Sequence, residues 1–217
     1  MFTRYGYTTI GIVAIISFLL ITLTFFIQNN PLKVIILIVA ALMLFGTLNF
    51  FRDPDRKVPS KKGIIVSPAD GKIIITRKNV ANDFVGKNCN QISIFMSPLN
   101  VHVNRIPISG KVEYLKYYEG KFIAAFDDKA SENNERMEIG LVSEKGKVLF
   151  TQVAGFIARR IITELNIGDS VKIGERFGMI KFGSRVDVFV PENWTPVATL
   201  NESVTAGETI LFELKEQ

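Results

Sequence analysis

The chain has 217 residues and a formal net charge of +5, with a single histidine and a single cysteine. This length accommodates one domain of ordinary size and a shorter additional segment. One cysteine excludes an intramolecular disulfide, and one histidine argues against a zinc site, so we expect no metal. Residues 63–217 carry 19 basic and 19 acidic side chains. A neutral main domain argues against nucleic acid as a partner.

The N-terminal segment contains two uncharged, mostly apolar runs, 10–27 and 34–51, of 18 residues each. As a helix, each run would be about 27 Å long, close to the thickness of a bilayer's hydrocarbon core. A polar segment with Pro31 separates them. We therefore predict a transmembrane helical hairpin over residues 1–51. The alternatives are a signal peptide, disfavoured by the second run, and a buried soluble helix pair, disfavoured because neither run has a polar face.

Residues 52–62 contain five basic and two acidic side chains, together with Pro54 and Pro59. We interpret this segment as a basic juxtamembrane linker. Basic residues beside a span favour the cytoplasmic side, which predicts an inner-membrane protein whose main domain is cytoplasmic. The linker would also attract anionic lipid headgroups, unless its charge serves only as a topology signal.

From Gly63 onward, short runs of β-forming residues alternate with glycine or proline turns. Examples of these runs are 63–66, 72–76, 91–95, 111–115 and 147–151. A spacing of about ten residues is typical of all-β sandwiches and barrels. The turns at 67–73 and 166–174 resemble those of lipoyl-like and hybrid-barrel folds. We predict a mostly β domain over 63–217, a lipoyl-like or hybrid β-sandwich or barrel, after the N-terminal transmembrane α-helical hairpin.

Ser184 follows Gly183 at the end of a strand-like run. Attack of the Ser184 hydroxyl on the Gly183 carbonyl would convert the amide to an ester. β-Elimination would then release the upstream chain and leave dehydroalanine, which hydrolyses to a pyruvoyl group and ammonia. Glycine leaves the attacked carbonyl unhindered. The ordinary interpretation of a Gly-Ser pair is a simple turn.

His102 and Asp70 supply the other side chains that such a reaction needs. In an extended strand, Asn100, His102 and Asn104 would share one face, and an imidazole suits general-base catalysis. Asp70, directly before Gly71, would orient the imidazole. The alternatives are a packed or surface histidine and an aspartate in a plain turn. Spacing alone does not bring Asp70, His102 and Ser184 together.

The chain resembles phosphatidylserine decarboxylase, in the short form with a two-span anchor. The resemblance covers essentially the whole chain and rests on the runs 51–56, 67–71, 95–107, 120–122, 132–136, 152–155, 158–161 and 177–187.

The resemblance implies a proenzyme that cleaves itself between Gly183 and Ser184, giving a membrane-anchored β chain, 1–183, and an α chain, 184–217. These two chains would form a heterodimer. The covalent pyruvoyl cofactor would derive from Ser184, and Asp70, His102 and Ser184 would be the self-processing triad. The pyruvoyl carbonyl would accept electrons as phosphatidylserine in the bilayer loses CO₂ to give phosphatidylethanolamine. A homo-oligomer is a further expectation of the resemblance.

One position departs from longer bacterial forms, which have a second histidine where this chain has Arg105. His102 would then serve both self-cleavage and proton handling during decarboxylation. Arg105 and Asn104 are candidate substrate-binding residues, although a salt bridge would equally explain Arg105. Arg159 and Arg160 are further phosphate candidates, at least one of which we expect to be structural.

Two alternative functions remain. The same chemistry would act on an ether-linked serine phospholipid. In a different class, a non-enzymatic, membrane-anchored lipoyl-like adaptor or fusion protein would share the hairpin and the β pattern, but would carry a long helical insertion that the sequence does not predict. A lipoylated carrier fits poorly, because the neighbours of Lys181 are large and apolar.

Overall fold

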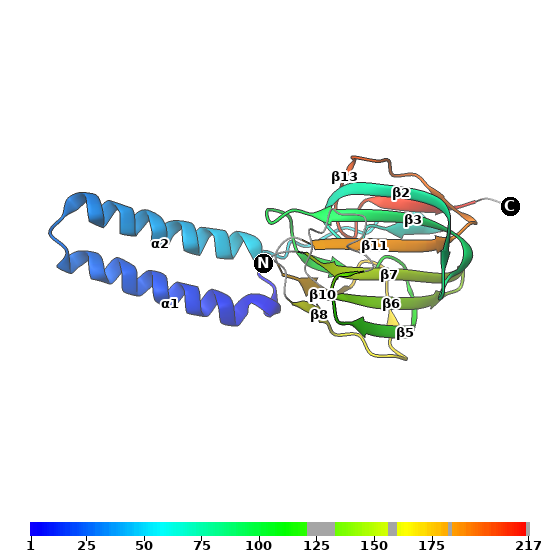
Figure 1. Ribbon diagram of the computed structural model, residues 1–217, viewed down its shortest axis with the longest axis horizontal. Coiled ribbons are helices and arrows are strands. Elements are labelled where there is room, and N and C mark those ends of the chain that lie inside the picture. The colour runs from blue at the N-terminus through cyan, green and yellow to red at the C-terminus, as the bar shows by residue number, and fades with distance from the viewer. Residues whose placement is uncertain (121–132, 156–159, 182–183, 216–217) are drawn as a thin grey trace. The chain divides into compact units, whose positions relative to one another are not determined.

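The computed structural model describes residues 1–120, 133–155, 160–181 and 184–215. The chain divides into two compact units, Met1–Asp55 and Arg56–Gln217, which are considered separately. The first unit is helical and the second is built of β-strands (Figure 1). The division falls inside the linker expected at 52–62.

The helical unit consists of α1 (Tyr7–Leu23) and α2 (Asn30–Phe50), with short 3-10 helices η1 (Arg4–Gly6) and η2 (Thr24–Phe26) on either side of α1. The two long helices lie side by side (Figure 1). The Ser17 hydroxyl donates to the Ala40 carbonyl at 3.4 Å. At the open end, the Thr3 N–H donates to the Phe51 carbonyl and the Asp53 N–H to the Met1 carbonyl. The predicted helical hairpin is therefore present.

Both helical segments, Arg4–Phe26 and Asn30–Phe50, are long and apolar enough to cross a membrane. Their boundaries differ from the prediction, because α2 already includes Pro31, which was expected to lie between the two helices. Proline is tolerated in the first turn of a helix, where its missing N–H costs no hydrogen bond. Asn29 caps that turn by accepting from the Leu32 N–H at 3.0 Å.

The second unit contains fourteen strands among its described residues. The first seven are β1 (Ile64–Val66), β2 (Gly71–Asn82), β3 (Gly86–Met96), β4 (Val103–Arg105), β5 (Gly110–Tyr118), β6 (Arg136–Ser143) and β7 (Gly146–Ala154). The others are β8 (Ile161–Thr163), β9 (Ser170–Val171), β10 (Arg176–Ile180), β11 (Ser184–Pro191), β12 (Trp194–Pro196), β13 (Ser203–Val204) and β14 (Ile210–Leu214). The five predicted β runs fall in β1, β2, β3, β5 and β7.

Eight of the strands form one antiparallel sheet, in the order β13-β2-β3-β11-β7-β6-β5-β9. The sheet curls into a half-barrel (Figure 1). Two three-stranded sheets, β1-β14-β12 and β4-β10-β8, complete the domain. The mostly β architecture that the sequence predicts is confirmed.

Alternate residues of the central strand β11 point to opposite faces of the large sheet. Val186 and Val188 point into the hydrophobic core, which also receives Phe177 from β10 and Phe212 from β14. Ser184 has the same parity as Val186, so it lies on the core-facing side. Arg185 and Asp187 lie on the other face.

That other face is covered by the hairpin that joins β2 to β3. Phe84, near its tip, stacks on Tyr114 of β5 with ring centroids 5.5 Å apart. A Cβ on Gly140 of β6 would collide with the same phenylalanine ring. The hairpin therefore reaches β5 and β6, which β11 and β7 separate from β3 in the sheet order. Arg185 and Asp187 are buried although they lie outside the core.

Candidate active site

Ser184 is the first residue of β11, and its neighbours in the sheet are Met96 of β3 and Ala154 of β7. The serine is fully buried. Its hydroxyl donates to the Met96 sulfur at 3.2 Å. A thioether is a weak acceptor, so this contact orients the hydroxyl without holding it strongly. Gly183, the predicted partner in cleavage, lies outside the described residues.

The Met96 sulfur also connects Ser184 to two buried amide side chains. The Asn104 amide nitrogen lies 3.8 Å from that sulfur and 3.4 Å from the Pro68 carbonyl oxygen. The Asn104 amide oxygen accepts from the Gln152 amide nitrogen at 2.8 Å. Both amide residues are fully buried. The nucleophile candidate thus belongs to a polar cluster at the edge of an otherwise apolar core.

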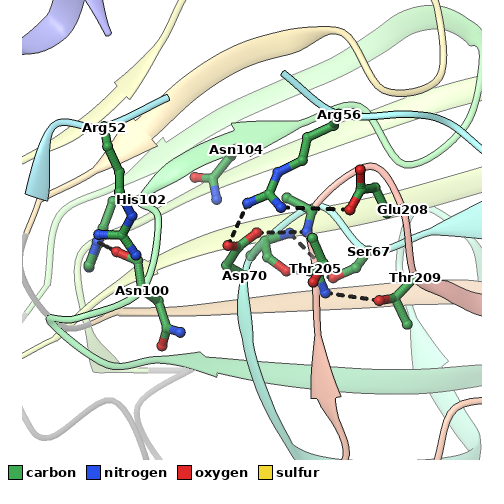
Figure 2. Close-up of polar contacts among 12 residues, drawn as sticks. Arg52, Arg56, Ser67, Asp70, Asn100, His102, Asn104, Thr205, Glu208 and Thr209 are labelled. Carbon is green, nitrogen blue, oxygen red and sulfur yellow. Dashed lines mark hydrogen bonds and ion pairs between the residues drawn. The ribbon is translucent and has the colours of Figure 1, made fainter. Parts of the chain in front are cut away.

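His102 follows a tight turn and directly precedes β4. The turn spans 97–100, with the Asn100 N–H donating to the Ser97 carbonyl at 2.9 Å. The His102 Nδ1 lies 2.9 Å from the Asn100 carbonyl oxygen (Figure 2). A carbonyl only accepts, so Nδ1 carries a proton and the lone pair of the neutral ring is on Nε2. This nitrogen is buried, and it is the atom that can act as a base.

The predicted strand face of Asn100, His102 and Asn104 is wrong in part. Only Asn104 lies within a strand, because β4 spans Val103–Arg105. Pro98 stands at the second position of the turn, where its fixed φ is favourable, and the chain reverses there instead of extending. The Asn100 side chain closes the turn by accepting from the Ser97 N–H at 2.8 Å.

Asp70 directly precedes β2 and contacts two distant parts of the domain. Its carboxylate pairs with Arg56 at 2.8 Å and accepts from the Ala206 N–H, also at 2.8 Å. Arg56 reaches Glu208 at 3.6 Å as well. In Figure 2 the carboxylate points toward Arg56. Asp70 therefore couples the linker to the 205–209 segment near the C-terminus.

Arg105 follows Asn104 in β4 and so points to the opposite side of that strand. Its guanidinium donates to the Gly174 carbonyl at 3.0 Å, and the side chain is buried. This contact with a backbone carbonyl supports a structural role for Arg105.

Lys181, three residues before Ser184 in the sequence, lies close to Arg160. The Lys181 N–H donates to the Arg160 carbonyl at 3.2 Å. Burial, and then the charge of Arg160, lower the pKa of the Lys181 ammonium. Two cations in one place suit an anionic group. Arg159, the other phosphate candidate, lies outside the described residues.

Comparison with known proteins decides the family. The family model described as phosphatidylserine decarboxylase matches residues 45–212. The chain belongs to the phosphatidylserine decarboxylase family. As a member of this family it is an enzyme of the carboxy-lyase class.

Several phosphatidylserine decarboxylase proenzymes are similar to the chain over nearly its full length. The proenzyme from Chlorobium phaeovibrioides is 49% identical over 216 residues, 99% of this chain and 97% of the relative. The one from Pelodictyon phaeoclathratiforme is 49% identical over 211 residues, 97% of this chain and 99% of the relative. That from Prosthecochloris aestuarii is 44% identical over 217 residues, 99% and 98% of the two chains.

Reasoning from the sequence missed two residues of the candidate site around Ser184. Gln152 and Met96 stand in runs that carry the resemblance, but neither was assigned a role. Methionine and glutamine are ordinary strand residues, and no local spacing relates them to Ser184. Only the register of β3 and β7 beside β11 reveals their position.

Proposed function

We propose that this chain is a proenzyme that cleaves itself between Gly183 and Ser184, converts Ser184 into a pyruvoyl group, and decarboxylates phosphatidylserine to phosphatidylethanolamine. Membership of the family supports the reaction. The observation that best supports the cleavage site is the position of Ser184, which is buried as the first residue of a central strand.

The strand pairing fits a cut directly before Ser184. β11 keeps its pairing with β3 and β7 from Ser184 onward, so the cut breaks none of these described ladder contacts. β14 pairs with β1, which holds the end of the 184–217 fragment against the 1–183 fragment. We therefore expect the two fragments to remain together as a heterodimer.

Ser184, His102 and Asp70 have different roles in the proposed reaction. The Ser184 hydroxyl attacks the Gly183 carbonyl, and the buried Nε2 of His102 takes up the hydroxyl proton. The Gly183–Ser184 amide bond then breaks to leave an ester, and the imidazolium passes the proton to the Ser184 nitrogen, which leaves as an amine. Asp70 completes the triad and stabilises the charge that develops on the imidazole. Once formed, the pyruvoyl group supplies an electron-accepting carbonyl at the first residue of β11. His102 then returns a proton to the headgroup carbon from which CO₂ has left.

The helical unit supports the proposed location and a substrate held in the bilayer. Two helices able to cross a bilayer support anchoring in the inner membrane, with the β domain on the cytoplasmic side where basic linkers are favoured. Tethering confines enzyme and phospholipid to one surface, which raises their effective concentration. A serine phospholipid with ether-linked chains presents the same headgroup and would be accepted by the same site.

Intact-mass analysis of the purified full-length protein tests the proposal, with Ser184→Ala as the comparison. We expect fragments 1–183 and 184–217, the latter blocked by a pyruvoyl group, and a single uncut chain in the variant. The processed protein should release CO₂ from vesicles that contain phosphatidylserine. An uncut wild-type chain, or processed protein that leaves these vesicles unchanged, would overturn the proposal.

A further inference from the structure

Gln152 lies beside Ser184 on the core-facing side of the large sheet. It faces Val186 of β11, and its neighbour two residues on, Ala154, faces Ser184. Residues opposite each other in an antiparallel pair share a face, so the Gln152 and Ser184 side chains are diagonal neighbours. Such diagonal positions are about 7–8 Å apart, within reach of a long side chain.

The orientation of the Gln152 amide follows from the cluster it belongs to. The Pro68 carbonyl only accepts, so the atom of Asn104 that faces it is the amide nitrogen. The other end of the Asn104 amide is then an oxygen, and the Gln152 atom that donates to it at 2.8 Å is a nitrogen. The Gln152 oxygen Oε1 is therefore the end that faces away from Asn104.

This oxygen is buried and has no hydrogen-bond partner among the described residues. Folded proteins pair most buried polar atoms, because leaving an acceptor unsatisfied is costly. The indole nitrogen of Trp194 is also buried and unsatisfied in the described part of the chain, but it lies in β12, in a different sheet from Ser184. Gln152 combines an unsatisfied acceptor with a place next to the reacting serine.

We propose that Gln152 Oε1 accepts a hydrogen bond from the primary amine of the lipid headgroup and positions it at the group formed from Ser184. A serine phospholipid headgroup contains a phosphodiester, a carboxylate and an ammonium. Only the ammonium donates hydrogen bonds, so it is the part of the headgroup that suits an acceptor. This inference rests on the proposed function and assigns the amine subsite within that site.

The test measures binding to processed enzyme that has been treated with borohydride. Reduction converts the pyruvoyl ketone to an alcohol, so the amine can no longer be captured covalently. Titration calorimetry in detergent then compares a short-chain ethanolamine phospholipid, which has N–H donors, with the matching choline phospholipid, which has none. The variants are Gln152→Met, which keeps the volume, and Gln152→Glu, which keeps an acceptor.

Gln91→Met is the matched control. Gln91 is also buried, lies in β3 of the same sheet, and donates to Ser93 at 3.1 Å. It pairs with Phe189 and so lies on the face opposite Ser184. We expect the wild type, Gln91→Met and Gln152→Glu to prefer the ethanolamine lipid by about ten-fold or more, as for a hydrogen bond to a charged group. Gln152→Met should bind both lipids equally.

A preference retained in Gln152→Met would overturn the inference, as would a wild type without any preference or a Gln152→Glu variant that has lost it. These results are distinguishable from failure of the proposed function. Intact mass and CO₂ release from the unreduced wild type report on that function, whereas the lipid preference reports only on the amine subsite.

Discussion

Arg185, the residue directly after Ser184, forms a 2.6 Å ion pair with Asp187, and both side chains are only 1% exposed. Arg185 also donates to the Ser93 hydroxyl of β3 at 3.0 Å. These contacts lie on the face of β11 opposite Ser184. Because the proposed cut leaves Ser184 at a chain end, they would hold the new terminus in the sheet.

Asp187→Ala should lower the free energy of unfolding by about 3–5 kcal/mol, because it leaves a buried guanidinium without its carboxylate. Urea unfolding of the full-length protein in detergent measures this change. The double variant Arg185→Met, Asp187→Leu should recover most of the loss. Glu213→Ala is the control, since its 2.6 Å pair with Lys61 is largely open to solvent, with side chains 56% (Lys61) and 33% (Glu213) exposed, and is expected to contribute less than about 1 kcal/mol. Equal losses in Asp187→Ala and Glu213→Ala would contradict the prediction.

The contacts of Asp70 predict a smaller effect on self-cleavage for a substitution of Arg56 than for a substitution of Asp70 itself. Arg56→Met removes one ion pair from Asp70 but leaves the bond from the Ala206 N–H, so self-cleavage should slow by about five-fold. Asp70→Ala removes both contacts and the triad carboxylate, and should slow cleavage by more than about 100-fold. The fraction of uncut chain, followed by mass spectrometry, measures both rates.

Lys61→Met, in the same linker, is the control for the Arg56 variant and should cleave at the wild-type rate. If Arg56→Met were as slow as Asp70→Ala, Asp70 would act mainly by holding the linker and not as a member of the triad.

Cys89 should report on opening of the domain. It is fully buried, and burial raises the pKa of its thiol, an effect that a backbone hydrogen bond from Asn82 partly offsets. The Cys89 thiol therefore keeps its proton above pH 9 in the folded state, whereas it loses the proton there in the unfolded state. For this reason Cys89 lowers the free energy of unfolding as the pH rises past 9. A disulfide reagent at pH 8 should label the native protein slowly and the urea-unfolded protein at once. Rapid labelling without urea would show that the β2–β3 region opens easily.

Gly178 should tolerate no side chain. It lies in β10, between β4 and β8, and a Cβ there would collide with the Ile162 carbonyl oxygen. Because both groups belong to paired backbones, we expect Gly178→Ala to cost about 1–3 kcal/mol, measured by thermal unfolding. Gly46→Ala in α2 meets nothing within 4 Å and should be neutral or stabilising. An unchanged melting temperature for Gly178→Ala would refute the expected collision.

Local patterns in the sequence were sufficient for the two long helices and for five of the fourteen described strands. Apolar run length and strand-like composition depend on neighbouring residues, so they predict elements without knowledge of their partners. The errors also have local causes. Pro31 was expected to lie between the two helices but stands in the first turn of α2. Pro98 turns the chain before His102, where a continuous strand was expected.

The sequence by itself was enough to name Ser184, His102 and Asp70 as candidate site residues, and the resemblance identified the family of the chain. Tertiary structure decided what each side chain touches. Asp70 bonds to Ala206, 136 residues away, and Ser184 meets Met96, 88 residues away. Pairing between strands so distant in the chain depends on the whole sheet closing together, and no local pattern encodes it. For the same reason the acceptor on Gln152 became visible only when β7 was placed beside β11.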